Sequence, residues 1–164
     1  MIKEFKFLLI LFVLIDHNQV FGEGMLIDDM RNIEGEPQGE YCENDTTKWC
    51  LITDRVMGGV SEGDLCVNKT DKGFYLSLTG DVSTENNGGF IQARTKITNH
   101  PNDKQFLGVR IKVRGNGEEY SIHLRTKYLL FPWQYYYSTF TATAQWETID
   151  LKFSEFQKSN FSQF

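Results

Sequence analysis

The residue types best suited to chemistry gather in one stretch, Asp54 to Gly63, which reads DRVMGGVSEG. Asp54 and Arg55 are adjacent opposite charges, and the neighbouring Gly58 and Gly59 can adopt positive φ values that other residues avoid. The Ser-Glu-Gly at the end of the stretch indicates a second turn. Because the stretch has the period of neither a strand nor a helix, we interpret it as a shaped platform. Two ordinary tight turns with a surface ion pair are the alternative.

A second turn-rich loop, Glu85-Asn86-Asn87-Gly88-Gly89, lies further along the chain. Asn followed by Gly suits the positive φ values of a hairpin turn. We expect Arg55 to form an ion pair that holds the two loops together, and its candidate partners are Asp54, Glu62 and Glu85. The binding residues assigned to the two loops are Asp54, Arg55, Met57, Gly58, Gly59, Glu62, Glu85, Asn86 and Asn87.

The sequence offers no catalytic constellation. A Ser–His–acid triad in the mature chain would need His100, which lies in a polar loop before Pro101, or His123, which lies on the basic face of an expected strand. Nothing sets two of the loop carboxylates opposite each other as a general acid and base. We therefore expect a non-enzymatic protein without a cofactor, with a hydrolase as the rival interpretation.

Metal ligands are also sparse, so no metal site is expected. Asp28 and Asp29 are adjacent acids, which either a solvated strand end or a structural calcium ion would explain. Cys42, Cys50 and Cys66 are the three cysteines, and two of them can pair in an oxidising compartment. A short loop favours Cys42–Cys50, although spacing alone does not decide the pairing. Zinc is a weaker alternative because no Cys-x-x-Cys occurs.

The amino-terminal residues predict entry into the secretory pathway. Met1–Lys6 carries two lysines, Phe7–Ile15 is an apolar run too short to span a bilayer comfortably, and a cleavage site is expected after Gly22. We expect a signal peptide over 1–22, no stable membrane span after cleavage and a single domain over 23–164; an uncleaved anchor is the alternative. Three Asn-x-Ser/Thr sequons, headed by Asn44, Asn68 and Asn160, agree with secretion. The net charge of −5 argues against nucleic acid as the main partner.

Alternating apolar residues predict an all-β protein, a β-sandwich or jelly roll. The expected strands are 74–79, 90–97, 107–114, 120–125 and 146–153, with Ile149, Leu151 and Phe153 facing inward in the last of these. We expect 107–114 and 120–125 to form a hairpin around Gly-Asn-Gly. A short helical turn is expected near Ser154.

That hairpin would carry basic residues on one face, namely Arg110, Lys112, Arg114, His123 and Arg125. Within an acidic protein such a face predicts a local anion-binding patch, of which Arg110, Arg114 and Arg125 are the candidate binding residues; a solvated outer face is the alternative. The aromatic run from Phe131 to Thr143 suits stacking on sugars, docking of a partner or filling of the core.

Three segments together resemble the complex I intermediate-associated protein 30 family: DRVMGGVSEG at 54–63, VSTENNGGF at 82–90 and VRIKVRGNGEEYSIHLRT at 109–126. The likeness spans about residues 26–156. It implies a galactose-binding-like jelly roll and a factor that assists assembly of the NADH–ubiquinone oxidoreductase in mitochondria by binding unassembled subunits or other assembly factors. It implies no catalytic residues.

The chain departs from that family in two respects. It carries what reads as a secretion signal where mitochondrial members carry a presequence, so we expect an extracellular location, with the mitochondrion as the alternative. Family members also continue with further strands beyond 153–156, so we expect a carboxy-terminally truncated sandwich with exposed strand edges. A secreted carbohydrate-binding module, with a glycan as its partner, is the alternative function.

Overall fold

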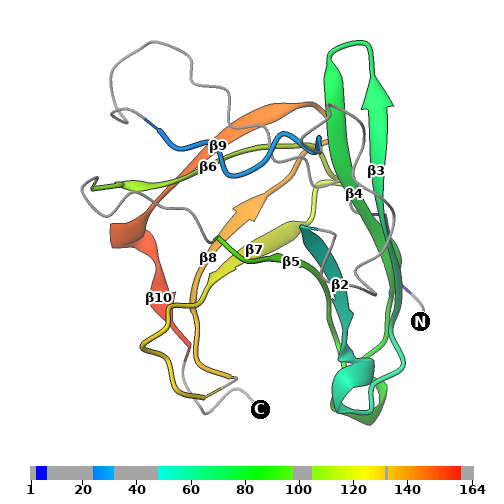
Figure 1. Ribbon diagram of the computed structural model, residues 1–164. Helices are drawn as coiled ribbons and strands as arrows, with labels where there is room; N and C mark the ends of the chain where they lie inside the picture. The colour runs from blue at the N-terminus through cyan, green and yellow to red at the C-terminus, as the bar shows by residue number, and fades with distance from the viewer. Residues whose placement is uncertain (1–2, 7–23, 32–47, 98–104, 132, 160–164) are drawn as a thin grey trace.

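The structure is a computed structural model that describes residues 3–6, 24–31, 48–97, 105–131 and 133–159 (Figure 1). It is an all-β sandwich, as the alternation of apolar residues predicts. The strands are β1 (Lys3–Lys6), β2 (Trp49–Thr53), β3 (Glu62–Thr70), β4 (Gly73–Val82), β5 (Ile91–Thr95), β6 (Gly108–Val113), β7 (Glu119–Leu124), β8 (Tyr136–Thr141), β9 (Glu147–Lys152) and β10 (Gln157–Lys158). Three short 3₁₀ turns are interspersed: η1 (Asp54–Met57), η2 (Glu85–Asn87) and η3 (Phe153–Glu155).

All of the described strand pairs are antiparallel. The pairings are β1–β4–β3, β2–β5, β6–β9 and β7–β8–β10. Figure 1 shows the long β3–β4 hairpin at one side of the molecule and β6, β7, β8 and β9 curving across the other. At the lower end of β3–β4, Gly63 pairs with Gly80, where a β-carbon on Gly80 would lie 2.7 Å from Gly63 Cα. Gly80 therefore allows close approach of two regular strands.

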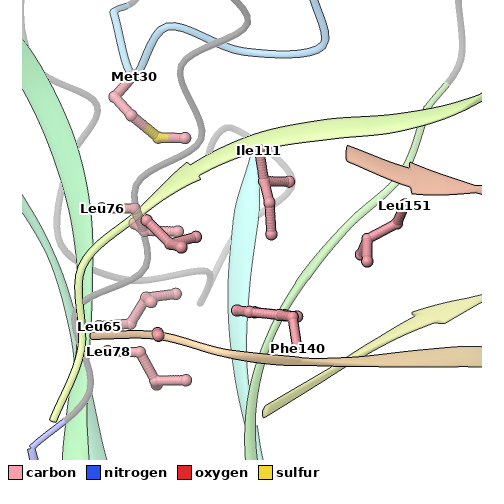
Figure 2. Packing of buried hydrophobic residues seen from close by; sticks show 9 residues of the cluster. Met30, Leu65, Leu76, Leu78, Ile111, Phe140 and Leu151 are labelled. Atoms are coloured by element: carbon pink, nitrogen blue, oxygen red, sulfur yellow. The ribbon is translucent and has the colours of Figure 1, made fainter. Parts of the chain in front are cut away.

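The core lies between these two groups of strands because each strand buries every second side chain. Leu65, Leu76 and Leu78 come from the β3–β4 hairpin. Figure 2 shows them facing Ile111, Phe140 and Leu151, and Met30 lies at the edge of the same cluster. Ile27 packs against it, whereas Leu26 is exposed, so only one member of the apolar pair at 26–27 joins the core.

The expected hairpin between 107–114 and 120–125 is wrong. β6 pairs with β9, with Ile111 opposite Ile149, and β7 pairs with β8, with Tyr120 opposite Phe140. The Gly-Asn-Gly segment instead donates backbone hydrogen bonds to the chain after β8, from Gly115 N–H to the carbonyl of residue 143 at 2.7 Å and from Gly117 N–H to that of residue 142 at 2.8 Å. These bonds fix the segment that connects β6 in one sheet to β7 in another.

Two further details of the predicted strands are corrected. The Glu85–Gly89 turn exists, but it does not close a hairpin, since β4 pairs with β1 and β3 while β5 pairs with β2. Phe153 is exposed because the strand ends before it and the chain turns into η3, which confirms the helical turn near Ser154. The jelly-roll strand order and the truncated carboxy terminus stay predictions.

The predicted signal peptide lies mostly outside the described residues and stays a prediction. In the described part of the chain, no helix has both the length and the apolar character that a membrane crossing requires.

Candidate binding site

The platform at 54–63 is built around a buried carboxylate. Asp54 follows β2 directly and opens η1, and its side chain is fully buried. The Thr53 hydroxyl accepts the Arg55 N–H at 3.4 Å and so caps the turn, which ends on Gly58 in the left-handed conformation (φ 92°). This short turn places Asp54 inside the molecule and the residues after it outside.

Four groups donate hydrogen bonds to the Asp54 carboxylate, and they come from two loops. Ser61 supplies its backbone N–H at 2.9 Å and its hydroxyl at 2.5 Å. The second loop supplies the backbone N–H groups of Gly89 at 2.6 Å and Phe90 at 3.4 Å. The main chain of Asp54 also donates to the Phe90 carbonyl at 3.1 Å. A single side chain therefore joins the two glycine-rich loops.

The glycines of both loops leave room for this carboxylate. A β-carbon on Gly59 would lie 2.8 Å from Asp54 Cβ and closer still to Cγ. A β-carbon on Gly88 would lie 2.9 Å from Asp54 Cγ and closer still to Oδ2. Real β-carbons do not approach other atoms so closely, so these two glycines are required by contact with Asp54 rather than by turn geometry.

The surroundings of Asp54 favour its ionised form. Exclusion of water raises the pKa of this carboxyl, but hydrogen bonds from Ser61, Gly89 and Phe90 lower it more, so the pKa lies below its usual range. The Ser61 hydroxyl is committed as well, since it donates to Asp54 and accepts the Ser83 N–H at 3.0 Å. The cluster is thus a charged structural centre with its polar groups paired.

Arg55 forms the ion pair that the sequence predicts, with Glu62 at 2.8 Å. Both side chains are largely exposed. The pair joins η1 to the start of β3 and does not reach the Glu85–Gly89 loop, so the predicted role of Arg55 in holding the two loops together belongs to Asp54.

Apolar side chains project outward from the same platform. Val56 is 73% exposed and Met57 54% exposed, and Val60 on the far side of the two glycines is exposed as well. We call these three residues the platform face. Met57 is among the residues assigned from sequence; Val56 and Val60 are not, although their apolar types inside a turn-rich stretch are a usable signal.

The second loop presents a polar surface beside this centre. Glu85, Asn86 and Asn87 are exposed, and both asparagines have positive φ, 54° and 59°. The positive φ values predicted for this loop are thus present, but they shape the turn that brings Gly89 to Asp54.

Each of the three assigned arginines has a partner within the chain. Arg110 binds Asp150 through two nitrogens, at 2.5 and 2.7 Å. Arg114 lies over the Trp146 ring at 5.1 Å, and Arg125 donates to the Phe131 carbonyl at 3.1 Å. Because β6 and β7 belong to different strand pairs, they do not form the hairpin on which the anion-binding face is predicted, and the patch itself stays a prediction.

A second carboxylate, Asp28, is buried, so the prediction of a solvated strand end at 28–29 is wrong for this residue. It accepts the Met30 N–H at 2.8 Å and the Trp49 indole N–H at 2.7 Å, and the Lys48 ammonium lies 3.2 Å away. These contacts make Asp28 an anchor for the segment that carries Met30 into the core. Among the described residues, no cluster of three or more His, Cys, Asp or Glu side chains suits a metal ion.

Comparison with protein families identifies the family to which the chain is related. The model of the complex I intermediate-associated protein 30 family matches residues 40–163. The chain belongs to this family. Comparisons with curated proteins and with solved structures gave no match.

For this complex I intermediate-associated protein 30 family member, the resemblance seen in the sequence is confirmed. The family name connects the chain to the assembly of complex I. Both loops of the Asp54 cluster fall inside the matched segment, as do all ten residues of DRVMGGVSEG.

The disulfide and glycosylation predictions for this family member remain predictions. Cys50 lies half-buried on β2 and Cys66 half-buried on β3, while Cys42 lies outside the described residues. Asn68 is half-buried on β3 and its side-chain amide donates to the Cys66 carbonyl at 3.4 Å. Asn44 and Asn160 lie outside the described residues.

Proposed function

We propose that this chain is a non-enzymatic binding domain that holds unassembled protein subunits, in the manner of a chaperone, during the assembly of complex I. Membership of the complex I intermediate-associated protein 30 family supports a role in the assembly of complex I. The observation that carries the mode of action is the platform face, where Val56, Met57 and Val60 stand exposed on a base fixed by buried Asp54.

The fixed base favours binding for an energetic reason. Exposed apolar groups gain free energy when a partner covers them, and gathered groups of this kind mark interaction sites. A loop that is ordered before it meets a partner loses less conformational entropy on binding. The four hydrogen bonds to Asp54 order this loop in the absence of any partner.

The pairing of polar groups supports a binding role over a catalytic one. The Asp54 oxygens accept from Ser61, Gly89 and Phe90, and the Ser61 hydroxyl directs its proton to Asp54. A nucleophile or general base must present its reactive atom to a substrate. These two residues present theirs to each other instead.

Location is part of the proposal. The amino-terminal residues favour the secretory pathway, whereas the assembly of complex I requires the mitochondrion. A tagged full-length chain, followed by fractionation and by glycosidase treatment, separates the two. Recovery from the medium as a glycosylated protein would exclude action on mitochondrial subunits and would leave a binding domain used outside the cell.

Site-specific photo-cross-linking tests the partner. A photoreactive residue in place of Met57, in the full chain expressed in cells, should capture unassembled complex I subunits that mass spectrometry identifies. The matched control carries the same residue in place of Leu107, which is 59% exposed on a different part of the chain. Equal capture from both positions, or no complex I subunit from Met57, would contradict the proposal.

A second candidate, the carbohydrate-binding module, has one observation in its favour. A hollow of about 310 Å³ on the β7–β8 pair is lined by aromatic, hydroxyl and carboxylate groups: Glu119, Tyr120, Ser121, His123, Tyr135, Tyr137 and Thr139. Such a mixture suits stacking and hydrogen bonding to a sugar. A glycan array probed with the full chain and with Tyr137→Ala tests it, and signals unchanged by the substitution would count against this site.

A further inference from the structure

The loop between β7 and β8 exposes large apolar side chains far from the Asp54 cluster in sequence. Leu130 is 84% exposed and Tyr128 is 78% exposed, and Phe131 and Trp133 are exposed beside them. We call these four residues the apolar loop. Figure 1 shows the gold segment after β7 reaching beyond the ends of the strands at the lower left of the view. Exposed apolar side chains gathered on one projecting segment mark a binding surface.

The backbone of this loop is held in place. Leu129 N–H donates to the Thr126 carbonyl at 3.1 Å, and Gln134 N–H donates to the Phe131 carbonyl at 3.1 Å. The Ser159 hydroxyl donates to the Trp133 carbonyl, also at 3.1 Å. The rings of Phe131 and Trp133 stack with centroids 4.9 Å apart. The apolar groups therefore project from a fixed support.

The charged residues of the segment that carries the loop have one sign. The chain carries a net charge of −5, yet no Asp or Glu occurs between residues 120 and 146. Lys127 lies next to the loop, with its ammonium 5.3 Å from the Tyr128 ring centroid, and Arg125 is fixed on the Phe131 carbonyl at 3.1 Å. Lys158 on β10 pairs with Tyr136 at the same end of the sheet, while Glu119 pairs with Thr141 at the opposite end.

We propose that the apolar loop is a membrane-anchoring element that inserts Tyr128 and Leu130 into the surface of an anionic lipid bilayer. The most exposed side chains would enter the acyl boundary, and Trp133 would lie at the level of the headgroups, where its amphipathic ring is favoured. Arg125, Lys127 and Lys158 would then face lipid phosphates and carboxylates. This arrangement needs no membrane-spanning segment, and it leaves the platform face to a protein partner.

A bilayer fits this loop better than a protein partner does. The cores of protein–protein interfaces are depleted in charge, and Lys is depleted in interfaces generally. Here Lys127 stands directly beside exposed apolar residues, and the sequence between residues 120 and 146 contains no acid, which is the combination found in segments that bind anionic membranes.

Sedimentation with vesicles tests the inference. The full chain is mixed with vesicles of phosphatidylcholine alone and of phosphatidylcholine with phosphatidylserine. We expect stronger binding to the anionic vesicles and a decrease as the ionic strength rises. Leu130→Ser should weaken this binding about tenfold because a large apolar side chain no longer enters the lipid. Lys127→Gln should weaken it about fivefold on the anionic vesicles only.

The matched control is Leu107→Ser, which makes the same substitution at another exposed leucine, just before β6. It should leave vesicle binding unchanged. Every variant keeps residues 1–22, so any contribution of the apolar run at 7–15 is the same throughout. Equal binding of Leu130→Ser and Leu107→Ser, or no difference between neutral and anionic vesicles, would overturn the proposal.

Fluorescence supplies a readout that reports the loop itself. Brominated lipid in the vesicles should quench the part of the tryptophan emission that Trp133→Phe removes, because Trp49 and Trp146 lie outside the apolar loop. If Leu130→Ser instead abolishes cross-linking of a protein partner while quenching is unchanged, the loop is a protein-docking surface and the lipid assignment fails.

Discussion

The backbone N–H of Gly89 donates a 2.6 Å hydrogen bond to Oδ2 of Asp54, a residue 35 positions earlier in the chain. This bond links the loop after β4 to the turn after β2. Neither loop pairs with the other as a strand. The position of the platform face therefore depends on one buried carboxylate.

Asp54→Asn should destabilise the protein by about 3 kcal/mol. Every group that contacts the carboxylate is a donor, so the new amide must direct its own N–H₂ at one of them and leave a buried donor without an acceptor. Urea unfolding followed by circular dichroism measures the change. Asp64→Asn, an exposed position on β3, is the matched control and should change stability by less than about 0.5 kcal/mol. Equal effects of the two substitutions would show that Asp54 does not hold the loops.

Alanine at Gly59 should be more harmful than alanine at Gly58, although the two are adjacent. At Gly58 a β-carbon meets no atom within 4 Å, so the cost comes only from its positive φ and should be about 1–2 kcal/mol. At Gly59 the β-carbon would overlap the Asp54 side chain and displace it. Gly117→Ala is the control, because Gly117 also has positive φ and open space. Unfolding curves that rank Gly58→Ala as the most damaging of the three would contradict this explanation.

Arg55→Met should lower stability by less than about 0.5 kcal/mol. The Arg55–Glu62 pair is exposed on both sides, so water and salt screen the attraction, and ordering two long side chains offsets much of what remains. Thermal unfolding at low and high salt measures this, with Glu62→Gln as the reciprocal variant. A loss comparable to that of Asp54→Asn would restore the role that the sequence suggests for Arg55.

Much of the fold is readable from the sequence because side-chain alternation is a local property. Ile111 and Val113 alternate with polar residues and mark β6 without knowledge of any other segment. The partner of a strand is not local. β6 pairs with β9 because both bury their apolar faces in the same core, and a short Gly-Asn-Gly turn looks the same whether it closes a hairpin or joins two sheets.

In the candidate site too, local features can be read from the sequence and contacts between distant segments cannot. The glycines and charges of the platform are visible in the sequence, and they correctly indicate a shaped segment. The burial of Asp54 is not visible, because an acid is ordinarily exposed and the amides that compensate its burial belong to Gly89 and Phe90 in another loop. The sequence predicts Arg55 as the linking residue because the pairing of adjacent charges can be read locally.

The last prediction concerns pH. Because the pKa of Asp54 is lowered in the folded state, the unfolded chain binds more protons in the window between the folded pKa and the ordinary value of about 3.9. The stabilisation by Asp54 is therefore complete above about pH 5 and is lost as the pH falls through the folded pKa. Asp29 and Glu147 also have lowered pKa values, through hydrogen bonds with Arg31 and Thr143, so the wild type alone does not isolate Asp54. The informative quantity is the difference in unfolding free energy between wild type and Asp54→Asn, which should shrink as the pH falls from about 5 to about 2. A difference that stays constant over this range would show that the ionised carboxylate is not what holds the two loops.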